Sequence, residues 1–531
     1  MIGYIAVKEF RNNIATAGFV IGLLLCLALI PYTVYTGIQT YTNRLVQYTL
    51  DVKAAEETYN RACVYSRVKP VPVKPVSSLS IFSKGISEQT GSKVKIDYKE
   101  KPVFSADIVS LNENPFMGGF LSLDFVTAIA ILLSLLGVLF SYDTLSREKE
   151  QGTLKLALSN PVSRSTFFLG KIAGIFLTLV PVLVLCFLAV LLVIQLSPAV
   201  QFSSGDYGRI GMLLLVSLVY FAFFVFLGGF ISSRAKSSKT SIILNLFIWC
   251  FLLFLLPNAA AWIGKNMVPV EDYKQLQFET GEIDREWMNV QKKEVDKILK
   301  NENLKHIGAS YYDGDHWAGA SFTIFTPKAT VDYERRTNEL AIPLLMDNCA
   351  KKWAIQSDYL QQVYRQERTM RYLTCLSPAG IFKHIAAALC RTGIDSEVHF
   401  MDQVRQFQDT FFGYFVQNRI FSSYAYFTPQ KEEDFPVDSE DGIKQMMEWN
   451  EWVANNVNLS NLSEYTYGNM YDFGKLGYEY VNTQSLPHFN CPPLMLGSDL
   501  YGQLYLIAGI LIICLLLFWF SYVSFIKYDV R

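Results

Sequence analysis

Six long apolar runs constrain how this 531-residue chain can fold, because each is long enough to cross a bilayer as a helix. A hydrocarbon core of about 30 Å needs roughly 20 predominantly apolar residues in helical form. No Lys or Arg interrupts any of the runs. The sequence therefore predicts an α-helical polytopic membrane protein with six transmembrane helices, at residues 15–38, 121–142, 172–196, 210–232, 241–263 and 503–525.

Composition supports this fold class and disfavours one class of partner. Hydrophobic residues make up 51% of the chain and charged residues 18%, which argues against a wholly soluble or disordered protein. The formal net charge is only -1, so the chain has no overall basic field to attract nucleic acid. We expect a lipid bilayer around the spans and no nucleic-acid partner.

Positive charges beside the short loops predict the orientation of the spans. If the six helices cross the membrane in alternating directions, nearly all of these cations fall on one side of it. The short loop on the opposite side (197–209) carries only Arg209. Both termini are therefore expected in the cytoplasm, with the chain in a bacterial cytoplasmic (inner) membrane. The cations on the predicted cytoplasmic side are Lys8, Arg11, Arg147, Lys149, Lys155, Arg164, Lys171, Arg234, Lys236, Lys239, Lys527 and Arg531.

Two long loops, 39–120 and 264–502, then lie outside the cytoplasm and form one large, mostly α (α+β) extracytoplasmic domain. The first loop opens with a helical continuation (39–62) and contains short β-like runs. The second has helical periodicity followed by a turn-rich stretch. The cytoplasmic parts are an amphipathic interfacial helix (1–14), a segment at 143–171 and a tail at 526–531. The β-like runs are 93–98 and 103–109, and the predicted loop helices are 281–300, 331–374, 379–391 and 395–418.

The loop cysteines and histidines suggest chemistry only weakly. In an oxidising compartment the five loop cysteines allow up to two disulfides with one thiol left over, and the pairing stays open. A run of two aspartates and a histidine, Asp313, Asp315 and His316, is a weak metal candidate. A solvated Asx turn before a surface histidine is the favoured interpretation, because no second ligand set has metal-site spacing. The five cysteines are Cys63, Cys349, Cys375, Cys390 and Cys491.

The strongest signal lies between the second and third runs, at residues 142–164. Leu145, Leu154, Leu156 and Leu158 are expected to face lipid or protein, while the charged run 147–150 faces the cytoplasm. One interpretation is an interfacial helix that caps two spans. The other is a docking element that a cytoplasmic partner moves.

This segment closely resembles the signature of ATP-binding-cassette permeases of the type-2 exporter class (ABC-2). The branch it resembles has large external loops and includes gliding-motility and copper-enzyme-maturation permeases. The resemblance covers the membrane part, but not the 39–120 loop or most of 264–502. The residues that carry it are Asp143, Arg147, Glu148, Glu150, Gly152, Thr153, Leu154, Ser159, Pro161, Ser163, Arg164, Gly170 and Lys171.

The resemblance implies a docking site for a separate cytoplasmic ATPase dimer and a second permease chain, identical or related. It also implies that an N-terminal interfacial helix, with Lys8, Glu9, Phe10 and Arg11, lies along the inner membrane surface. A periplasmic or outer-membrane partner is a further option. The implied docking residues are Asp143, Arg147, Glu148, Glu150, Gly152, Thr153, Leu154, Pro161, Arg164 and Lys171.

The chain itself is expected to be non-catalytic. The only Gly-Lys pair of the signature, 170–171, is followed by Ile172 and opens an apolar run, so it offers no phosphate-binding loop. ATP and Mg would belong to the ATPase subunit, and no cofactor is expected in this chain. A membrane-anchored enzyme using His316 or Cys375 is a minor alternative, because no Gly-x-Ser-x-Gly or His-Glu-x-x-His motif is present.

Polar residues within the runs leave two interpretations open. Ser134, Ser141, Asn245 and Asn258 are candidates for a substrate path, but interhelical hydrogen bonding explains them at least as well. The leading function is an export permease. Its alternative is mechanotransmission, in which ATP work reshapes the external domain and no cargo crosses the spans.

Overall fold

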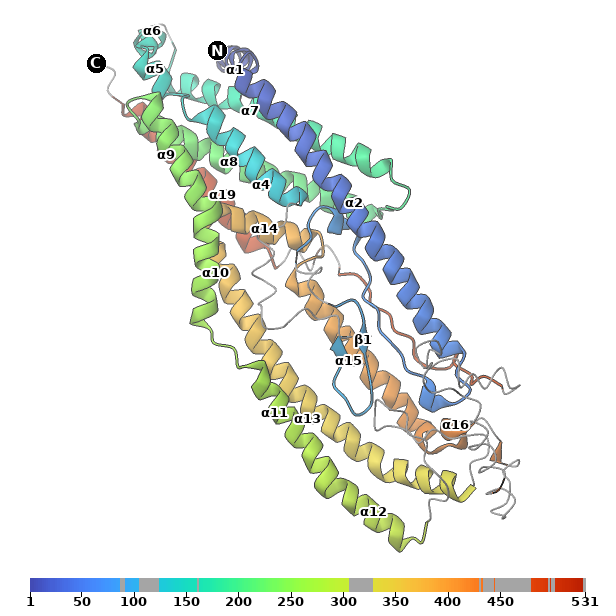
Figure 1. Cartoon of the computed structure of the whole chain (residues 1–531). Coiled ribbons are helices and arrows are strands. Elements are labelled where there is room, and N and C mark those ends of the chain that lie inside the picture. The colour runs from blue at the N-terminus through green and yellow to red at the C-terminus, as the bar shows by residue number, and fades with distance from the viewer. Residues whose placement is uncertain are drawn as a thin grey trace, which may run out of the picture.

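The computed structural model describes residues 1–85, 91–104, 124–159, 162–304, 328–428, 431–432, 444, 479–494, 497 and 502–528. The molecule is elongated, with a helix bundle at one end and a long helical arm at the other (Figure 1). Both chain ends lie at the end of the bundle farthest from the arm, here called the terminal end (Figure 1). The Asp313, Asp315 and His316 candidates lie outside the described residues.

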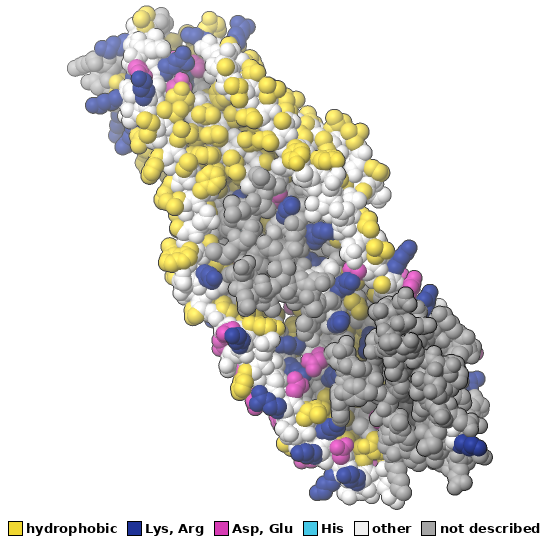
Figure 2. Space-filling model, viewed as in Figure 1, with side chains coloured by type: hydrophobic (Ala, Val, Ile, Leu, Met, Phe, Trp, Pro, Cys, Tyr) yellow, Lys and Arg dark blue, Asp and Glu magenta, His cyan; other side chains and the backbone are white. Residues whose placement is uncertain are grey.

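Six helices of the described chain are long and apolar enough to cross a membrane, which confirms the α-helical polytopic fold class. Hydrophobic side chains cover the bundle surface, and charged side chains gather at the terminal end and along the arm (Figure 2). The helices of the bundle are α2 (Ala17–Asn60), α4 (Phe125–Ser141), α7 (Arg164–Gln195), α8 (Ser204–Arg234), α9 (Ser238–Cys250) with α10 (Leu256–Met267), and α19 (Leu504–Ile526).

Helix α2 does not end with its apolar run at residue 38. Its 44 residues span about 66 Å at about 1.5 Å per residue, roughly twice the thickness of a hydrocarbon core. Hydrogen bonding within the helix continues through the polar residues that follow, so one helix passes from the bundle into the arm (Figure 1). This agrees with the helical continuation expected at 39–62.

Helix α8 lies in the centre of the bundle, where it packs against α4, α19 and α14 (Pro378–Leu389). Its Tyr220, Phe221 and Phe224 side chains are fully buried. Tyr220 stacks on Phe382 of α14 with ring centroids 4.6 Å apart. Part of the second long loop therefore packs within the bundle, an arrangement that the sequence did not predict.

The helix formed by α9 and α10 contains a π turn at Phe251–Leu255. A π turn changes the hydrogen-bonding pattern and leaves backbone groups open to other partners. Here the Leu252 carbonyl accepts a hydrogen bond from Ser377 Oγ at 2.5 Å, just before α14 begins. The π turn therefore anchors α14 against the bundle.

Paired long helices form most of the arm. Helix α13 (Lys328–Thr374) runs beside α10 and α11. The helices expected at 331–374, 379–391 and 395–418 are present within three residues of their expected bounds, whereas the helix expected at 281–300 begins earlier, at Tyr273. Among the described residues, the arm also contains α11 (Tyr273–Glu286), a π turn (Trp287–Gln291), α12 (Lys292–Asn301), α15 (Ile394–Gln417) and α16 (Tyr424–Phe427).

The two long loops share one hydrophobic core. Tyr59 and Val68 of the first loop pack with Phe411 and Phe415 of α15. In the part of the chain that the structure describes, the β-like runs yield one short antiparallel pair, β1 (Val94–Lys95) and β2 (Val103–Phe104). Residues 105–109 of the second run lie outside the described residues. The five loop cysteines are free thiols, so neither of the two disulfides that their number allows is formed.

Candidate coupling site at the terminal end

Helix α1 (Ile2–Ile14) lies directly against α7, and two glycines make this close approach possible. A Cβ on Gly170 would stand 2.7 Å from Ile5 Cβ, and one on Gly174 would stand 2.4 Å from Glu9 Cβ. No larger residue fits at either position without displacing α1. Gly170 was among the signature residues, whereas Gly174 was missed; the small-x-x-x-small spacing of the two is the signal that identifies it.

Lys171 joins three helices at this site. Its Nζ lies 2.5 Å from Glu9 Oε1 on α1 and 2.6 Å from Glu148 Oε1 on α5 (Ser146–Glu150). The lysine is 6% exposed, so it is nearly removed from water. A buried cation is tolerated only when counter-charges and hydrogen bonds replace its hydration. The two carboxylates supply them and fix α1 and α5 to α7.

Further contacts attach α5 to α8 and α9. The backbone N–H groups of Leu145 and Ser146 both donate to Ser232 Oγ at 3.0 Å. Ser238 N, at the start of α9, donates to Glu150 Oε2 at 2.9 Å. Lys149 donates to the Ser233 carbonyl. A displacement of α5 must therefore move the ends of α7, α8 and α9 together.

The C-terminal end of α19 is held at the same place. Arg164 Nη1 donates to the carbonyls of Ile526 and Tyr528 at 2.6 and 2.7 Å. Lys149 Nζ also lies 4.2 Å from the centre of the Tyr528 ring, a cation–π contact. The short segment between α4 and α7 thus contacts α7, α8, α9 and Tyr528 just after α19, and Lys171 of α7 links it to α1.

Gly152 separates α5 from α6 (Thr153–Ser159) with a left-handed φ of +70°. Side chains other than glycine rarely adopt this conformation. After the turn, Leu154 is buried with Leu145 and Phe168, whereas Leu156 is 71% exposed. The α5–α6 segment is therefore anchored on one side and open on the other.

The outward surface of this segment consists of exposed charged, small and apolar residues. Arg147 is 63% exposed on its side chain and lies 3.7 Å from Asp143. We call this surface the docking face; its residues are Arg147, Glu150, Gln151, Gly152, Thr153, Lys155 and Leu156.

The expectation that the whole run 147–150 faces the cytoplasm was wrong for two residues, which turn toward the protein. Glu148 turns inward to Lys171, and Lys149 turns toward Ser233. The reason is helical phase, because residues three and four apart share a face. Glu148 and Lys149 lie on the side of the buried Leu145, whereas Arg147 and Glu150 are exposed on the other side.

The residues that the sequence analysis placed on the N-terminal helix also divide into inward-facing and exposed ones. Glu9 faces Lys171, and Phe10 is half-buried. Lys8 and Arg11 are exposed on α1. Pro161 lies outside the described residues, and the Leu158 side chain is not described.

The structure places three of the four substrate-path candidates inside the bundle, each with an intramolecular hydrogen bond. Ser134 Oγ accepts from Trp249 Nε1 at 2.8 Å and so links α4 to α9. Ser141 Oγ donates to the Gly137 carbonyl at 2.6 Å, and Asn245 Nδ2 donates to the Ser241 carbonyl at 3.0 Å. Asn258 is exposed on α10. Only the Ser134–Trp249 bond joins two helices, and it favours interhelical packing as the role of Ser134; Ser141 and Asn245 bond within their own helices.

Six apolar helices, four of which (α7, α8, α9 and α19) are joined at one end by the segment that follows α4, define a multi-pass α-helical membrane protein. Residues 4–303, more than half of the chain, match the family described as ABC-2 family transporter protein. The chain therefore belongs to the ABC-2 family of transporter proteins. Residues 340–448, whose described part includes most of α13 together with α14, α15 and α16, match a domain of unknown function (DUF3526).

One curated relative shows the same kind of protein. Over 135 residues the chain is 33% identical to the "Probable ABC transporter permease protein NosY" of Pseudomonas aeruginosa. The matched stretch is 24% of this chain and 48% of the relative, so the chain spans about half the length of that protein.

Proposed function

We propose that this chain is the membrane-spanning permease subunit of an ABC transporter, driven by a separate ATPase that docks on the α5–α6 docking face and exporting a substrate outward. Family membership supports the permease role. The cations gathered at the terminal end support a cytoplasmic position for both termini, with the arm on the opposite side of a bacterial inner membrane (Figure 2).

The observation that carries the proposal is the Lys171 junction. A push on α5 reaches α1 and α7 through Glu148 and Lys171, and it reaches α8 through the Ser232 hydroxyl. Coupling between distant sites needs packed elements with discrete arrangements, and a bundle fastened at one end supplies them. ATP-driven closure of the ATPase pair would thus move several spans at once.

The assembly that follows contains two permease chains, identical or related, and an ATPase dimer that holds ATP and Mg. Gly170 and Lys171 support the non-catalytic role of this chain, because Ile5 covers the glycine and two carboxylates hold the lysine within α7. A phosphate group needs open backbone N–H groups at a helix start, which a mid-helix position does not offer.

Affinity purification of the full chain from its native membrane, with mass spectrometry and an ATPase assay, tests the proposal. We expect a cassette ATPase to co-purify with vanadate-sensitive hydrolysis. Leu156→Glu should release that ATPase, because a charge replaces an exposed apolar contact. Leu50→Glu is the matched control, since Leu50 is 55% exposed on the arm portion of α2. Retention of the ATPase by Leu156→Glu would refute the docking face.

The second candidate is mechanotransmission, and continuous helices favour it. Helix α2 runs unbroken from the bundle into the arm. Gln366 of α13 donates to the carbonyls of Lys265 and Val268 at the end of α10, which ties a second arm helix to the spans. Movement of the spans can therefore reach the arm and a periplasmic or outer-membrane partner. ATP-dependent distance changes within the arm, without solute traffic in sealed vesicles, would select this function.

A further inference from the structure

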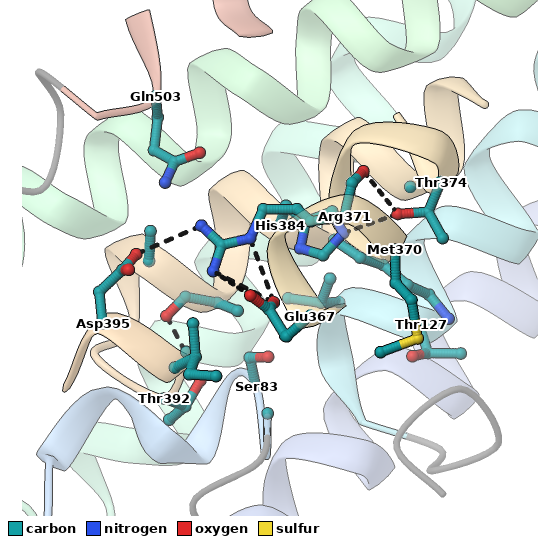
Figure 3. Close-up of a pocket in the computed structure, with 18 of the residues that line it drawn as sticks. Ser83, Thr127, Glu367, Met370, Arg371, Thr374, His384, Thr392, Asp395 and Gln503 are labelled. Carbon is teal, nitrogen blue, oxygen red and sulfur yellow. Dashed lines mark hydrogen bonds and ion pairs between the residues drawn. The ribbon is translucent and has the colours of Figure 1, made fainter. Parts of the chain in front are cut away.

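A cavity of about 140 Å³ lies where the bundle meets the arm, opposite the terminal end (Figure 3). Asp124 and Gln503, the residues that precede α4 and α19, line it from the bundle side. Glu367 and Arg371 of α13 and His384 of α14 line it from the arm side. An engineered cavity of similar volume holds one benzene ring, so this one admits a group of roughly six to eight heavy atoms.

The exposed aromatic residues near the cavity indicate its depth in the membrane. Tyr372 and Tyr505 are each about half exposed, and their ring centroids lie 6.3 Å apart. Trp262, beside the lining residue Ala261, is 64% exposed. Exposed tyrosine and tryptophan side chains are enriched where lipid headgroups meet the hydrocarbon. The cavity therefore lies at headgroup level.

A largely but not fully buried cation, Arg371, lies in the wall of the cavity. The Arg371 guanidinium contacts Glu367 at 3.1 Å and Asp395 Oδ2 at 3.4 Å, and the Arg371 side chain is 14% exposed. Arg371 is held in place by Glu367, while Asp395 is 63% exposed at the opposite side of the guanidinium. An anionic group entering the cavity can replace the solvated Asp395 and keep the buried pair intact.

Helix starts add to this preference for an anion. Gly393 precedes α15 and Gln503 precedes α19, and neither supplies a side-chain hydrogen bond to its own helix. Both residues line the cavity. The first N–H groups of a helix carry partial positive charge and favour an anionic partner.

Gln503 is an independent observation that points to a ligand in this cavity. Its side chain is directed toward the cavity (Figure 3), and the residue is 4% exposed. Within the described residues, its Oε1 has no hydrogen-bond partner. Leaving such a buried polar atom unpaired costs about 1–3 kcal/mol. A ligand that donates a hydrogen bond to the amide would remove this cost.

Apolar side chains complete the cavity. Val126 and Ala261 come from the spans, and Met370 and Ile394 come from the arm. A small inorganic ion would gain nothing from these walls, whereas the methylene groups of a lipid headgroup would pack against them.

We propose that this cavity binds the headgroup of a membrane amphiphile that carries a phosphate beside an ammonium or hydroxyl group, as phosphatidylethanolamine does. The phosphate lies toward Arg371 and the two helix starts, and the donor group pairs with Gln503. The acyl chains remain in the surrounding bilayer, because the cavity holds only the headgroup. The site requires neither ATP nor transport, so it stands independently of the proposed function.

Thermal unfolding of the full chain in detergent, without ATP, tests this site. Short-chain phosphatidylethanolamine should raise the Tm as a ligand of the native state, and phosphatidylcholine, which lacks a hydrogen-bond donor, should raise it less. Gln503→Leu should weaken the apparent affinity for phosphatidylethanolamine at least tenfold without lowering the Tm of the unliganded protein. Gln277→Leu, on the exposed face of α11, is the matched control and should bind as the wild type does.

The remaining outcomes are also decisive. Equal binding of the two lipids, or wild-type affinity in Gln503→Leu, would overturn the site. Free phosphoethanolamine is the probe for the source of the headgroup. If it binds as tightly as the lipid, the cavity takes a soluble phosphomonoester and the membrane origin is overturned. A lower Tm of unliganded Gln503→Leu would show that Gln503 has a structural role.

Discussion

Glu148 Oε1 and Lys171 Nζ lie 2.6 Å apart, and this ion pair joins the segment after the second span to the body of the third. Glu9 approaches the same nitrogen to 2.5 Å, so one lysine serves two carboxylates from different helices. Because the lysine is almost fully buried, each partner depends on the other two. The two ion pairs of Lys171 therefore hold α1, α5 and α7 together as one structural unit.

Removing the shared cation should therefore be costly. Lys171→Met leaves Glu9 and Glu148 close together without a counter-charge, and we expect a loss of about 3–5 kcal/mol in stability. Thermal unfolding in detergent measures this loss. Lys239→Met, the same substitution at an exposed position of the terminal end, should change the Tm little. Equal effects of the two substitutions would contradict the junction.

The close approach of α1 to α7 should fail when a methyl group is added. Gly174→Ala places a Cβ 2.4 Å from Glu9 Cβ, so α1 must move away, at a cost of about 1–3 kcal/mol. Limited proteolysis of the N-terminal helix should become faster, together with a lower Tm. Gly211→Ala on α8 is the control, because no atom lies within 4 Å of its added Cβ.

The hydrogen bond between Trp249 Nε1 and Ser134 Oγ should have a measurable coupling energy. We expect about 0.5–1.5 kcal/mol in a double-mutant cycle of Ser134→Ala and Trp249→Phe, since the bond is buried between two spans. Asn258→Ala should have almost no effect on stability, because Asn258 is exposed and bonds only within its own helix. A coupling energy near zero would reopen the substrate path as the role of Ser134.

Stability should fall with decreasing pH because of His384. Burial, with the nearby Arg371 and Lys383, lowers the pKa of His384 to about 3 from an ordinary value of 6.5. Below pH 6.5 the unfolded chain binds a proton that the native chain does not, so stability is full above pH 6.5 and falls toward pH 3. The slope from this one group is at most about 1.4 kcal/mol per pH unit.

Replacing His384 should flatten this dependence. His384→Gln retains a side-chain partner for Thr374 Oγ1, which lies 2.9 Å from His384 Nε2. The Tm measured between pH 7.5 and 5 should then fall less than that of the wild type. The difference at pH 7.5, where the histidine is neutral in both states, measures the effect of the substitution itself. An unchanged slope would assign the acid sensitivity to other groups.

Local pattern predicted most of the secondary structure. The spans follow from the length and hydropathy of six runs, and the arm helices follow from apolar residues at helical spacing. The expected helix at 331–374 is Lys328–Thr374, and the expected helix at 395–418 is Ile394–Gln417. Such features depend on neighbours within a few residues, which a sequence displays directly.

The candidate coupling site was predicted in position but not in geometry. The signature located the 143–171 segment, yet the inward turn of Glu148 and the need for Gly174 depend on where α1 packs. Likewise, the sequence left two roles open for Ser134, a substrate path or an interhelical hydrogen bond. The position of Trp249 favours the hydrogen bond. Residues far apart in sequence decide these features.

The sequence by itself determined that this chain has six membrane-spanning helices, a helical arm and the signature segment of its family, because hydrophobicity and helical period are local properties. Only the tertiary structure decided that Lys171 serves two carboxylates, that α14 packs against Tyr220 within the bundle, and that Gln503 faces a cavity. The physical reason is that these features depend on segments far apart in the chain packing together and excluding water. The periodicity of residues along the chain does not show which distant segments will pack together.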